Sequence, residues 1–244
     1  IDRGKILGLG VCMTGRVNPD TGRSYKYFTS SEQSLRDLLE ERVGIRVLLE
    51  NDTRARCYAE YTCGKSKDES NVLYLHMGRG VAIGIVVDGQ LYYGKSGFAG
   101  EFGHMVTHAG GLLCGCDQRG CFERYASASA LVRQAQRLDP SLDSGRAIFR
   151  RLREPRVKAV VDSWLREIVY GLASLIHLWD PDCLALCGGV MQQSYPVEQL
   201  KALVPKSVMP AYRSVSIQAA QLGNQAGLLG AAELARRLAA GQLR

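Results

Sequence analysis

The chain carries, at residues 100–123, the stretch GEFGHMVTHAGGLLCGCDQRGCFE. One histidine and three cysteines in it follow the pattern H-x9-C-x-C-x4-C. Thiolates and imidazole are the ligands of closed tetrahedral zinc sites, and a Cys3His set is typical of structural zinc. We therefore predict one structural Zn²⁺ ion bound by His104, Cys114, Cys116 and Cys121.

Other interpretations of the same stretch stay open. His108 is a rival for His104, because it lies nearer to the cysteines, although in a looser polar segment. The cysteines could also form a reduced thiol cluster without metal, or a Cys-x-Cys pair that switches between redox states.

Upstream of this stretch, short apolar strands alternate with helices. Residues 46–49 form a predicted strand that ends in Glu50-Asn51-Asp52, and residues 53–63 form a predicted helix. Asn51 and Asp52 are therefore expected at the end of a strand, directly before a helix N-terminus. The other expected elements are a strand at 6–13, a helix capped by Ser30 or Ser31 that runs to Val43, strands at 72–75 and 81–87, and a hairpin turn at Asp88-Gly89.

Downstream, the pattern continues to the end of the chain. The expected elements are a helical region at 127–136, a long helix at 157–178 stopped by Asp180-Pro181, a buried strand at 183–186 running into Gly188-Gly189, and a helix at 227–243. Alternation of strands and helices indicates an α/β fold.

The composition is that of a globular protein. The 244 residues are 46% hydrophobic and 23% charged, with a net charge of +7. No apolar run approaches the roughly 20 residues of a membrane span, and no secretory leader is visible, so we expect a cytoplasmic protein without a membrane partner. The basic residues are spread out, and the densest stretch, 146–158, is interpreted as a solvated helix face rather than a nucleic-acid-binding arm.

Residues 100–105 together with the cysteine pattern ending at Glu123 resemble the signature of the ROK family, which contains repressors, open reading frames of unknown role and sugar kinases. The resemblance extends over nearly the whole chain. Further similar segments are Glu50-Asn51-Asp52 at the sugar-contacting strand end, 78–84 at the second phosphate loop, 87–94 at the following hairpin, and 187–189 and 227–232 at the nucleotide side.

The resemblance implies an actin-like, ribonuclease-H-like fold of two lobes, with a sugar in the cleft between them and a zinc-stabilised loop. Residues 1–70 would form the remainder of the N-terminal lobe, with the helix 226–244 packing back on it. Residues 71–225 would form the C-terminal lobe with the zinc site. The phosphate-like positions implied by the resemblance are Gly78, Gly80, Gly188 and Gly189.

The resemblance also implies which side chains face the sugar, namely Asn51, Asp52, Glu101, His104 and Glu123. Carboxylates and amides suit this role because they pair with sugar hydroxyls. In the family's kinases the residue that matches Asp52 is the general base. Asp52 could instead cap the following helix, Glu101 could be a partner of a zinc ligand, and Glu123 could be a surface charge.

Several positions depart from the kinase pattern. Arg79 stands between the two glycines of the phosphate loop, where kinases usually carry a small hydroxyl residue. Arg54 and Arg56 stand where kinases tend to have small residues, and Asp117 replaces a glycine after the Cys-x-Cys pair. No Asp-x-Gly-x-Thr phosphate loop precedes Ile1, so we expect that the natural chain begins earlier.

These departures favour the effector region of a sugar-responsive transcriptional regulator, similar to the N-acetylglucosamine and xylose repressors. Its DNA-binding domain would precede Ile1, and a hexose or amino sugar would shift the DNA-binding state of a homodimer or higher homo-oligomer. The alternative is a sugar kinase, similar to glucokinases, that uses ATP and Mg²⁺ with Asp52 as general base. A zinc-stabilised interaction module without a ligand is a third interpretation.

Overall fold

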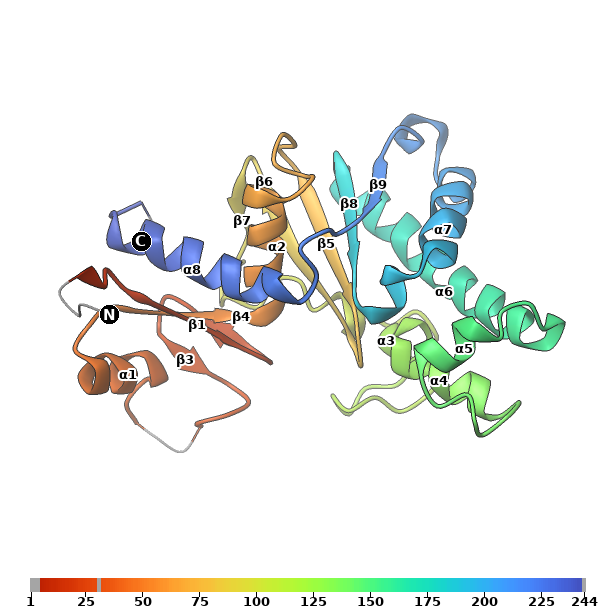
Figure 1. Ribbon diagram of the computed structural model, residues 1–244, viewed down its shortest axis with the longest axis horizontal. Coiled ribbons are helices and arrows are strands. Elements are labelled where there is room, and N and C mark those ends of the chain that lie inside the picture. The colour runs from red at the N-terminus through yellow and green to blue at the C-terminus, as the bar shows by residue number, and fades with distance from the viewer. Residues whose placement is uncertain (1–4, 30–31, 243–244) are drawn as a thin grey trace. The chain divides into compact units, whose positions relative to one another are not determined.

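The computed structural model describes residues 5–29 and 32–242 (Figure 1). Strands and helices alternate along the chain, as the sequence predicts. The principal elements are β1 (Leu9–Met13), β2 (Val17–Asn18), β3 (Arg23–Ser24), α1 (Leu35–Val43), β4 (Val47–Asn51), α2 (Asp52–Cys63), β5 (Val72–Met77), β6 (Val81–Val87), β7 (Gln90–Leu91), α3 (Glu123–Ala126), α4 (Ala128–Gln136), α5 (Gly145–Arg150), α6 (Pro155–Trp179), β8 (Cys183–Cys187), α7 (Ser194–Ser207), β9 (Ser216–Ala219) and α8 (Ala226–Ala239).

The contacts within the chain divide it into two compact units. The first contains the residues up to Ser70, residues 84–100, and the residues from Gln221 on; the second contains 71–83 and 101–220. Residues 84–100, which were predicted to belong to the second lobe, group with the first unit. The reason is packing, because Leu91 of β7 lies against the buried cluster around Tyr58 of α2.

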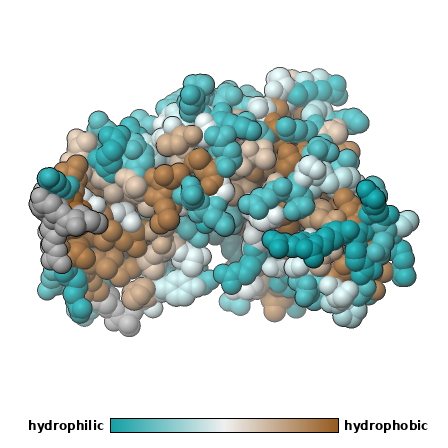
Figure 2. All heavy atoms as spheres, viewed as in Figure 1, coloured by the Kyte–Doolittle hydropathy of each residue, from teal (hydrophilic) through white to brown (hydrophobic). Residues whose placement is uncertain are grey.

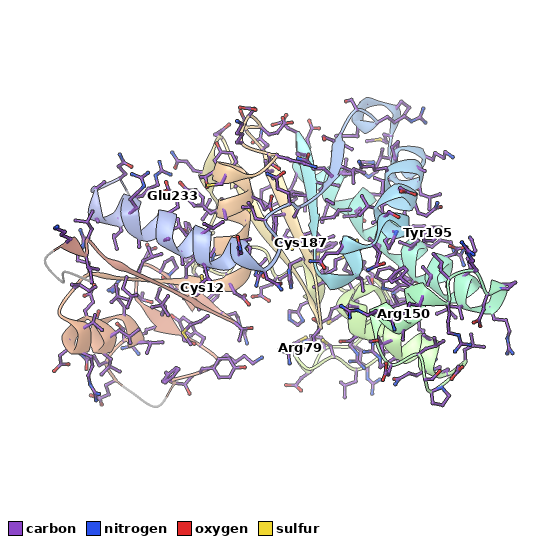
Figure 3. The ribbon with its side chains drawn as sticks, in the orientation of Figure 1. Cys12, Arg79, Arg150, Cys187, Tyr195 and Glu233 are labelled. Carbon is purple, nitrogen blue, oxygen red and sulfur yellow. The ribbon has the colours of Figure 1, made fainter. Side chains whose placement is uncertain are left out.

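In the first unit, β1 and β4 pair in parallel, from Leu9 opposite Val47 to Met13 opposite Asn51. Helix α8 packs against α2 and β1, and Figure 3 labels Cys12 on β1 beside it, where the Cys12 thiol donates to the Gly227 carbonyl at 3.3 Å. The C-terminal helix therefore belongs to the same core as β1 and β4.

Helix α1 begins later than the sequence indicated. Its N-cap is Ser34, whose hydroxyl accepts a hydrogen bond from the Asp37 amide at 3.1 Å. The predicted caps Ser30 and Ser31 lie outside the described residues. A side-chain oxygen three residues before a free amide is the usual way to satisfy the first turn of a helix.

A five-stranded sheet has the order β7-β6-β5-β8-β9, and its strands β5, β8 and β9 belong to the second unit (Figure 1). The strands β5, β8 and β9 are parallel, and His76 near the end of β5 lies opposite Cys187 at the end of β8. The carboxyl ends of β5 and β8 therefore meet at one edge, where open α/β sheets bind their ligands.

Helix α6 forms the main support of the second unit. It starts with Pro155 and ends at Trp179, where the predicted stop at Asp180-Pro181 follows, and the C-cap Asp180 adopts a left-handed φ of 43°. The fully buried Trp164 donates from Nε1 to the carbonyl oxygens of Ala126 and Ser127, at 2.9 and 3.1 Å. The helix thus holds the segment that follows the cysteine pattern.

The surface is mixed in character. Hydrophilic residues are spread over both units in the view of Figure 2, with hydrophobic residues between them. Over 5–29 and 32–242, no helix combines the length and the apolar character needed to cross a membrane.

Candidate metal centre and sugar-binding residues

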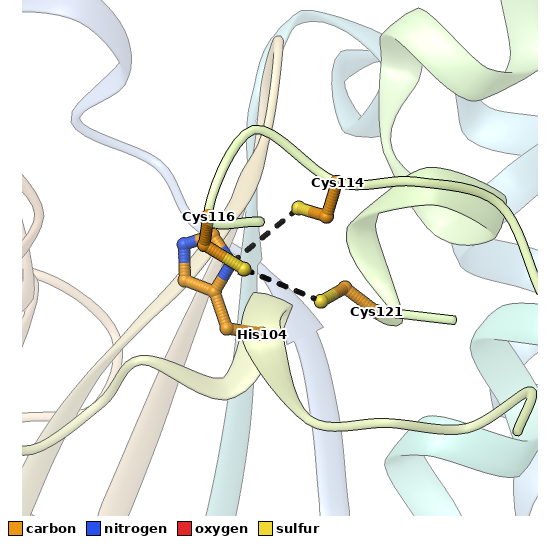
Figure 4. Close-up of side chains that lie close together, drawn as sticks. All are labelled: His104, Cys114, Cys116 and Cys121. Atoms are coloured by element: carbon orange, nitrogen blue, oxygen red, sulfur yellow. Dashed lines mark hydrogen bonds between the residues drawn. The ribbon is translucent and has the colours of Figure 1, made fainter. Parts of the chain in front are cut away.

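The structure brings the four predicted ligands together. The ligand atoms of His104, Cys114, Cys116 and Cys121 all lie within 4.8 Å of one another. Figure 4 shows the three thiols and the imidazole facing a common point. No other set of three or more such side chains within metal-binding distance occurs among the described residues.

Two separations between these atoms match those of ligands around a tetrahedral metal ion. The Cys116 and Cys121 sulfurs are 3.6 Å apart, and the Cys114 sulfur is 3.7 Å from Nδ1 of His104. A tetrahedral ion with metal–sulfur bonds of about 2.3 Å and metal–nitrogen bonds of about 2.0 Å separates its ligands by about 3.8 Å (sulfur to sulfur) and about 3.5 Å (sulfur to nitrogen). The donor set therefore fits a metal ion of this kind.

The thiols are held in different environments. Burial raises the pKa of the Cys114 thiol to about 12, and burial also raises the pKa of Cys121. The backbone amide of Gln118 lowers the pKa of Cys116. Without a cation the two buried thiols keep their protons at neutral pH, so a bound metal must displace them.

Local backbone structure positions the ligands. His104 closes a 3-10 turn at Phe102–His104 (η2), and the Cys114 amide donates to the Gln118 carbonyl at 2.8 Å. Asp117, which the resemblance predicts to replace a glycine, adopts φ 67°. Aspartate tolerates this left-handed conformation better than most residues do.

The two histidines have separate places. Nδ1 of His104 faces the cluster, and its Nε2 lies 3.6 Å from a Glu101 oxygen. His108 instead stacks on Tyr125, with ring centroids 3.7 Å apart, and its Nε2 lies 3.5 Å from Glu167. His104 rather than its rival belongs to the cluster, and Glu101 is placed to orient the ligand through its second nitrogen.

Glu123 connects the cluster to the turn between β5 and β6. One carboxylate oxygen accepts from the Cys114 thiol at 3.1 Å. The other lies so close to Gly80 that a Cβ there would sit 2.6 Å from it. A side chain at position 80 would therefore have to displace the Glu123 carboxylate from its present place. Phe122, which lies between Cys121 and Glu123, is 1% exposed and packs on Phe102, so it anchors this part of the chain in the core.

The phosphate-like glycines lie at the carboxyl edge of β5 and β8. The Gly78 amide donates to the Gly80 carbonyl at 3.0 Å, which closes a tight turn with Arg79 exposed at its tip (Figure 3). Gly188 has φ 116°, and a Cβ there would lie 2.0 Å from the Met77 carbonyl oxygen. Gly189 has open space beside it, with no atom within 4 Å of a Cβ.

The first unit carries Asn51 and Asp52 at the junction of β4 and α2, as predicted. Asn51, not Asp52, is the N-cap, and its Oδ1 accepts from the amides of Thr53 and Arg54 at 2.9 and 3.1 Å. Its Nδ2 donates to the Gly15 carbonyl at 2.9 Å and to Asp52 Oδ1 at 3.3 Å. The hydrogen-bonding groups of the Asn51 side chain are thus used within the protein.

Asp52 is the first residue of α2. Its Oδ1 also accepts from the Thr53 amide at 2.9 Å, whereas no donor among the described residues meets Oδ2. This oxygen has capacity left for a ligand hydroxyl. Beside it lies a feature that the sequence analysis missed, a buried ion pair between Glu50 and Arg54. Their spacing of four residues was a signal, but it crosses the strand–helix junction.

Comparison with known proteins decides the family. The model of the ROK family matches residues 2–238. The chain belongs to the ROK family. Over 259 residues it is 34% identical to the glucokinase of Streptomyces coelicolor, covering 95% of this chain and 81% of that protein. It is 27% identical to the xylose repressor of Bacillus spizizenii, covering 92% of this chain and 60% of the repressor.

A solved structure gives the same answer for the fold. The crystal structure of the ROK hexokinase from Thermus thermophilus superposes with a TM-score of 0.84 and 31% identity, covering 95% of this chain and 79% of that one. The predicted actin-like α/β fold of the family is confirmed. The relatives of this ROK protein include both kinases and a repressor, so the family alone leaves its activity open.

Proposed function

We propose that this ROK protein is the sugar-binding effector region of a transcriptional regulator. The similarity to the xylose repressor supports this, although the chain spans only 60% of that protein's length. In this proposal a hexose or amino sugar is the ligand, and DNA is contacted by a segment that these 244 residues do not contain.

The observation that carries the proposal is the position of Arg56. Its Nη1 donates to the Gly223 carbonyl at 3.2 Å. A Cβ added at Gly227 would lie 3.8 Å from the Arg56 side chain, which is ordinary van der Waals contact. Residues 227–232 resemble the nucleotide-side element of the family's kinases, so a nucleotide approaching this helix start would meet a guanidinium. Arg79, which stands between Gly78 and Gly80 where the resemblance to kinases predicts a small hydroxyl residue, also places a bulky charged side chain at a predicted phosphate position.

The ligand contacts follow from the groups that remain available. We propose that Asp52 accepts a sugar hydroxyl through Oδ2, and that Glu101, His104 and Glu123 provide further contacts. Asn51 fixes the start of α2 and would have to exchange a hydrogen bond to reach the sugar.

Zinc is the metal we propose for the cluster, because three thiolates and one imidazole are the ligands it prefers in structural sites. Bound there, the ion supplies a cross-link and no redox chemistry. Cys114 donates its thiol proton to Glu123, and metal binding displaces that proton, so the ion would free the Glu123 carboxylate for another donor. The metal would thereby make Glu123 available to the sugar.

Regulation would then arise from the coupling between sugar binding and a conformational equilibrium of the protein. A sugar that binds one conformation more tightly shifts the population toward it. We propose that this shift is passed on within a homodimer, because paired DNA sites require two-fold symmetry.

A second candidate is an ATP-dependent sugar kinase. Two observations favour it, namely the free Oδ2 of Asp52 and the identity to glucokinase, which is higher than that to the repressor. Asp52 would then take the proton from the attacking sugar hydroxyl.

Calorimetric titration distinguishes the two. We expect glucose, xylose, N-acetylglucosamine or N-acetylmannosamine to bind, and Glu123→Gln to weaken that binding at least about tenfold, as for the loss of a charged hydrogen bond. We expect no heat from a non-hydrolysable ATP analogue with Mg²⁺, with or without sugar. Nucleotide binding that requires the sugar would contradict the regulator and favour the kinase.

A further inference from the structure

Arg54 is a buried arginine, so its charge does not face solvent. It is 4% exposed, and its Nε donates to Glu50 Oε1 at 2.7 Å, while Glu50 is fully buried. Burial raises the pKa of Glu50 above its ordinary value, and the Arg54 charge opposes this. A buried pair of this kind persists only when the remaining donors are also satisfied.

The remaining donors of Arg54 reach two other segments of the first unit. Nη1 donates to the Gly97 carbonyl at 2.7 Å, in the loop 92–100, and Nη2 donates to the Val17 carbonyl at 2.7 Å, in β2. One guanidinium therefore joins three parts of the chain that are distant in sequence. Only the planar fork of arginine offers donors in three such directions.

The same segments approach each other around this centre. Asn18 donates from Nδ2 to the Ser96 carbonyl at 3.1 Å, and the Tyr93 ring lies 5.3 Å from the Arg54 guanidinium carbon. On its other side the centre adjoins the ligand-facing junction, since the Asn51 amide donates to the same Glu50 oxygen at 2.6 Å. Asn51 in turn holds Gly15.

We propose that Arg54 is the positioning residue of the sugar site, which ties the turn 15–18 and the loop 92–100 to the junction that carries Asn51 and Asp52. Arg54 touches no ligand, because all of its nitrogens face protein groups. It lowers the entropy that these segments lose when a sugar binds. The effect of Arg54 on sugar binding rests on the proposed function, whereas its effect on the order of residues 15–18 and 92–100 does not.

Amide hydrogen exchange on the full chain tests whether Arg54 holds these segments in place. Arg54→Lys keeps the positive charge beside Glu50 but loses the guanidinium hydrogen bonds to Gly97 and Val17. We expect exchange within residues 14–25 and 92–100 to become about tenfold faster or more, the factor for one hydrogen bond to a charged donor. The Ala99 amide, bonded to the Tyr93 carbonyl, and the Tyr25 amide, bonded to the Arg16 carbonyl, report on these segments. Strand β8 is the internal reference and should not change.

Two further variants separate positioning from charge burial. Arg54→Met leaves Glu50 buried without a partner, whereas Glu50→Gln combined with Arg54→Met removes both charges. We expect the double variant to recover thermal stability relative to the single one, while both segments stay unprotected. Arg151→Lys is the control for the same chemical change at a partly exposed site, because Arg151 donates to both Asp139 and Glu154 in the second unit.

The outcomes separate the inference from the proposed function. The positioning role would be overturned if residues 14–25 and 92–100 kept their protection from amide exchange in Arg54→Lys. It would also be overturned if the double variant regained that protection. Calorimetry with glucose, xylose, N-acetylglucosamine and N-acetylmannosamine should show an affinity reduced about tenfold or more in Arg54→Lys and unchanged in Arg151→Lys. If the unmodified protein binds none of these sugars, the proposed function fails, and the exchange data still judge the tie.

Discussion

Replacement of Cys121 by serine tests the metal centre, with Cys183→Ser as its matched control. Both cysteines are fully buried, with exposed fractions of 0%. Cys121 belongs to the four-residue cluster, whereas Cys183 lies on β8 and accepts a hydrogen bond from Gln218 at 2.9 Å. The two substitutions change the same atom in equally buried places.

The expected sizes differ by the contribution of the metal. A buried hydroxyl without full compensation costs about 1–3 kcal/mol, and both variants incur this cost. A metal present at about 1,000 times its Kd adds about 4 kcal/mol to the folded state. For a chain of this size about 1 kcal/mol corresponds to about 2–4 °C, so Cys121→Ser should melt about 8–16 °C below Cys183→Ser.

Metal analysis by mass spectrometry and thermal unfolding give the two readouts. We expect one zinc ion per chain in the unmodified protein and in Cys183→Ser, and well below one in Cys121→Ser. A chelator should lower the melting temperature of the first two proteins and leave Cys121→Ser unchanged. Equal metal content in both variants, or equal melting temperatures, would refute the assignment.

Three other changes have defined outcomes. Burial raises the pKa of Cys114 to about 12 and also raises the pKa of Cys121, so metal binding must release at least two protons at neutral pH. The zinc affinity measured by chelator competition should therefore rise at least about 100-fold per pH unit between pH 6 and 8; an affinity independent of pH contradicts thiol ligation. Phe122→Ala should cost about 3–5 kcal/mol in chemical denaturation, because the ring is 1% exposed; a loss below about 1 kcal/mol would mean that the ring is not a packing anchor. Gly80→Ala places a Cβ 2.6 Å from Glu123, so calorimetry should show sugar affinity reduced about tenfold, and an unchanged affinity would remove Glu123 from the sugar site.

The parts of the fold that the sequence predicts are those with strong local signals. Helix α6 has a long apolar periodicity and a Pro181 stop, and the hairpin at Asp88-Gly89 has turn residues that accept positive φ, which both adopt. Strand β9 and helix α7 were not predicted. The strand Ser216–Ala219 is short, and its pairing with β8 is a contact between distant segments, while α7 contains two prolines, which argue against a helix in isolation.

For the site, the sequence predicted the four residues that the structure brings together but not the contacts around them. The spacing of His104, Cys114, Cys116 and Cys121 constrains a loop so strongly that the ligand set follows from the pattern. The tie made by Arg54 could not be found in this way, because two of its partners are backbone carbonyl oxygens brought near by tertiary folding. Such acceptors exist at every residue and leave no mark in the sequence.

Sugar-dependent release of ADP from ATP is the measurement that most directly separates a sensor from a kinase. It should be made on the unmodified protein beside Asp52→Asn, with Mg²⁺ and the same four sugars. A sensor gives no ADP release above the sugar-free rate, while at least one sugar still raises the melting temperature. Turnover that depends on the sugar and disappears in Asp52→Asn would contradict the proposal and make this ROK protein a kinase.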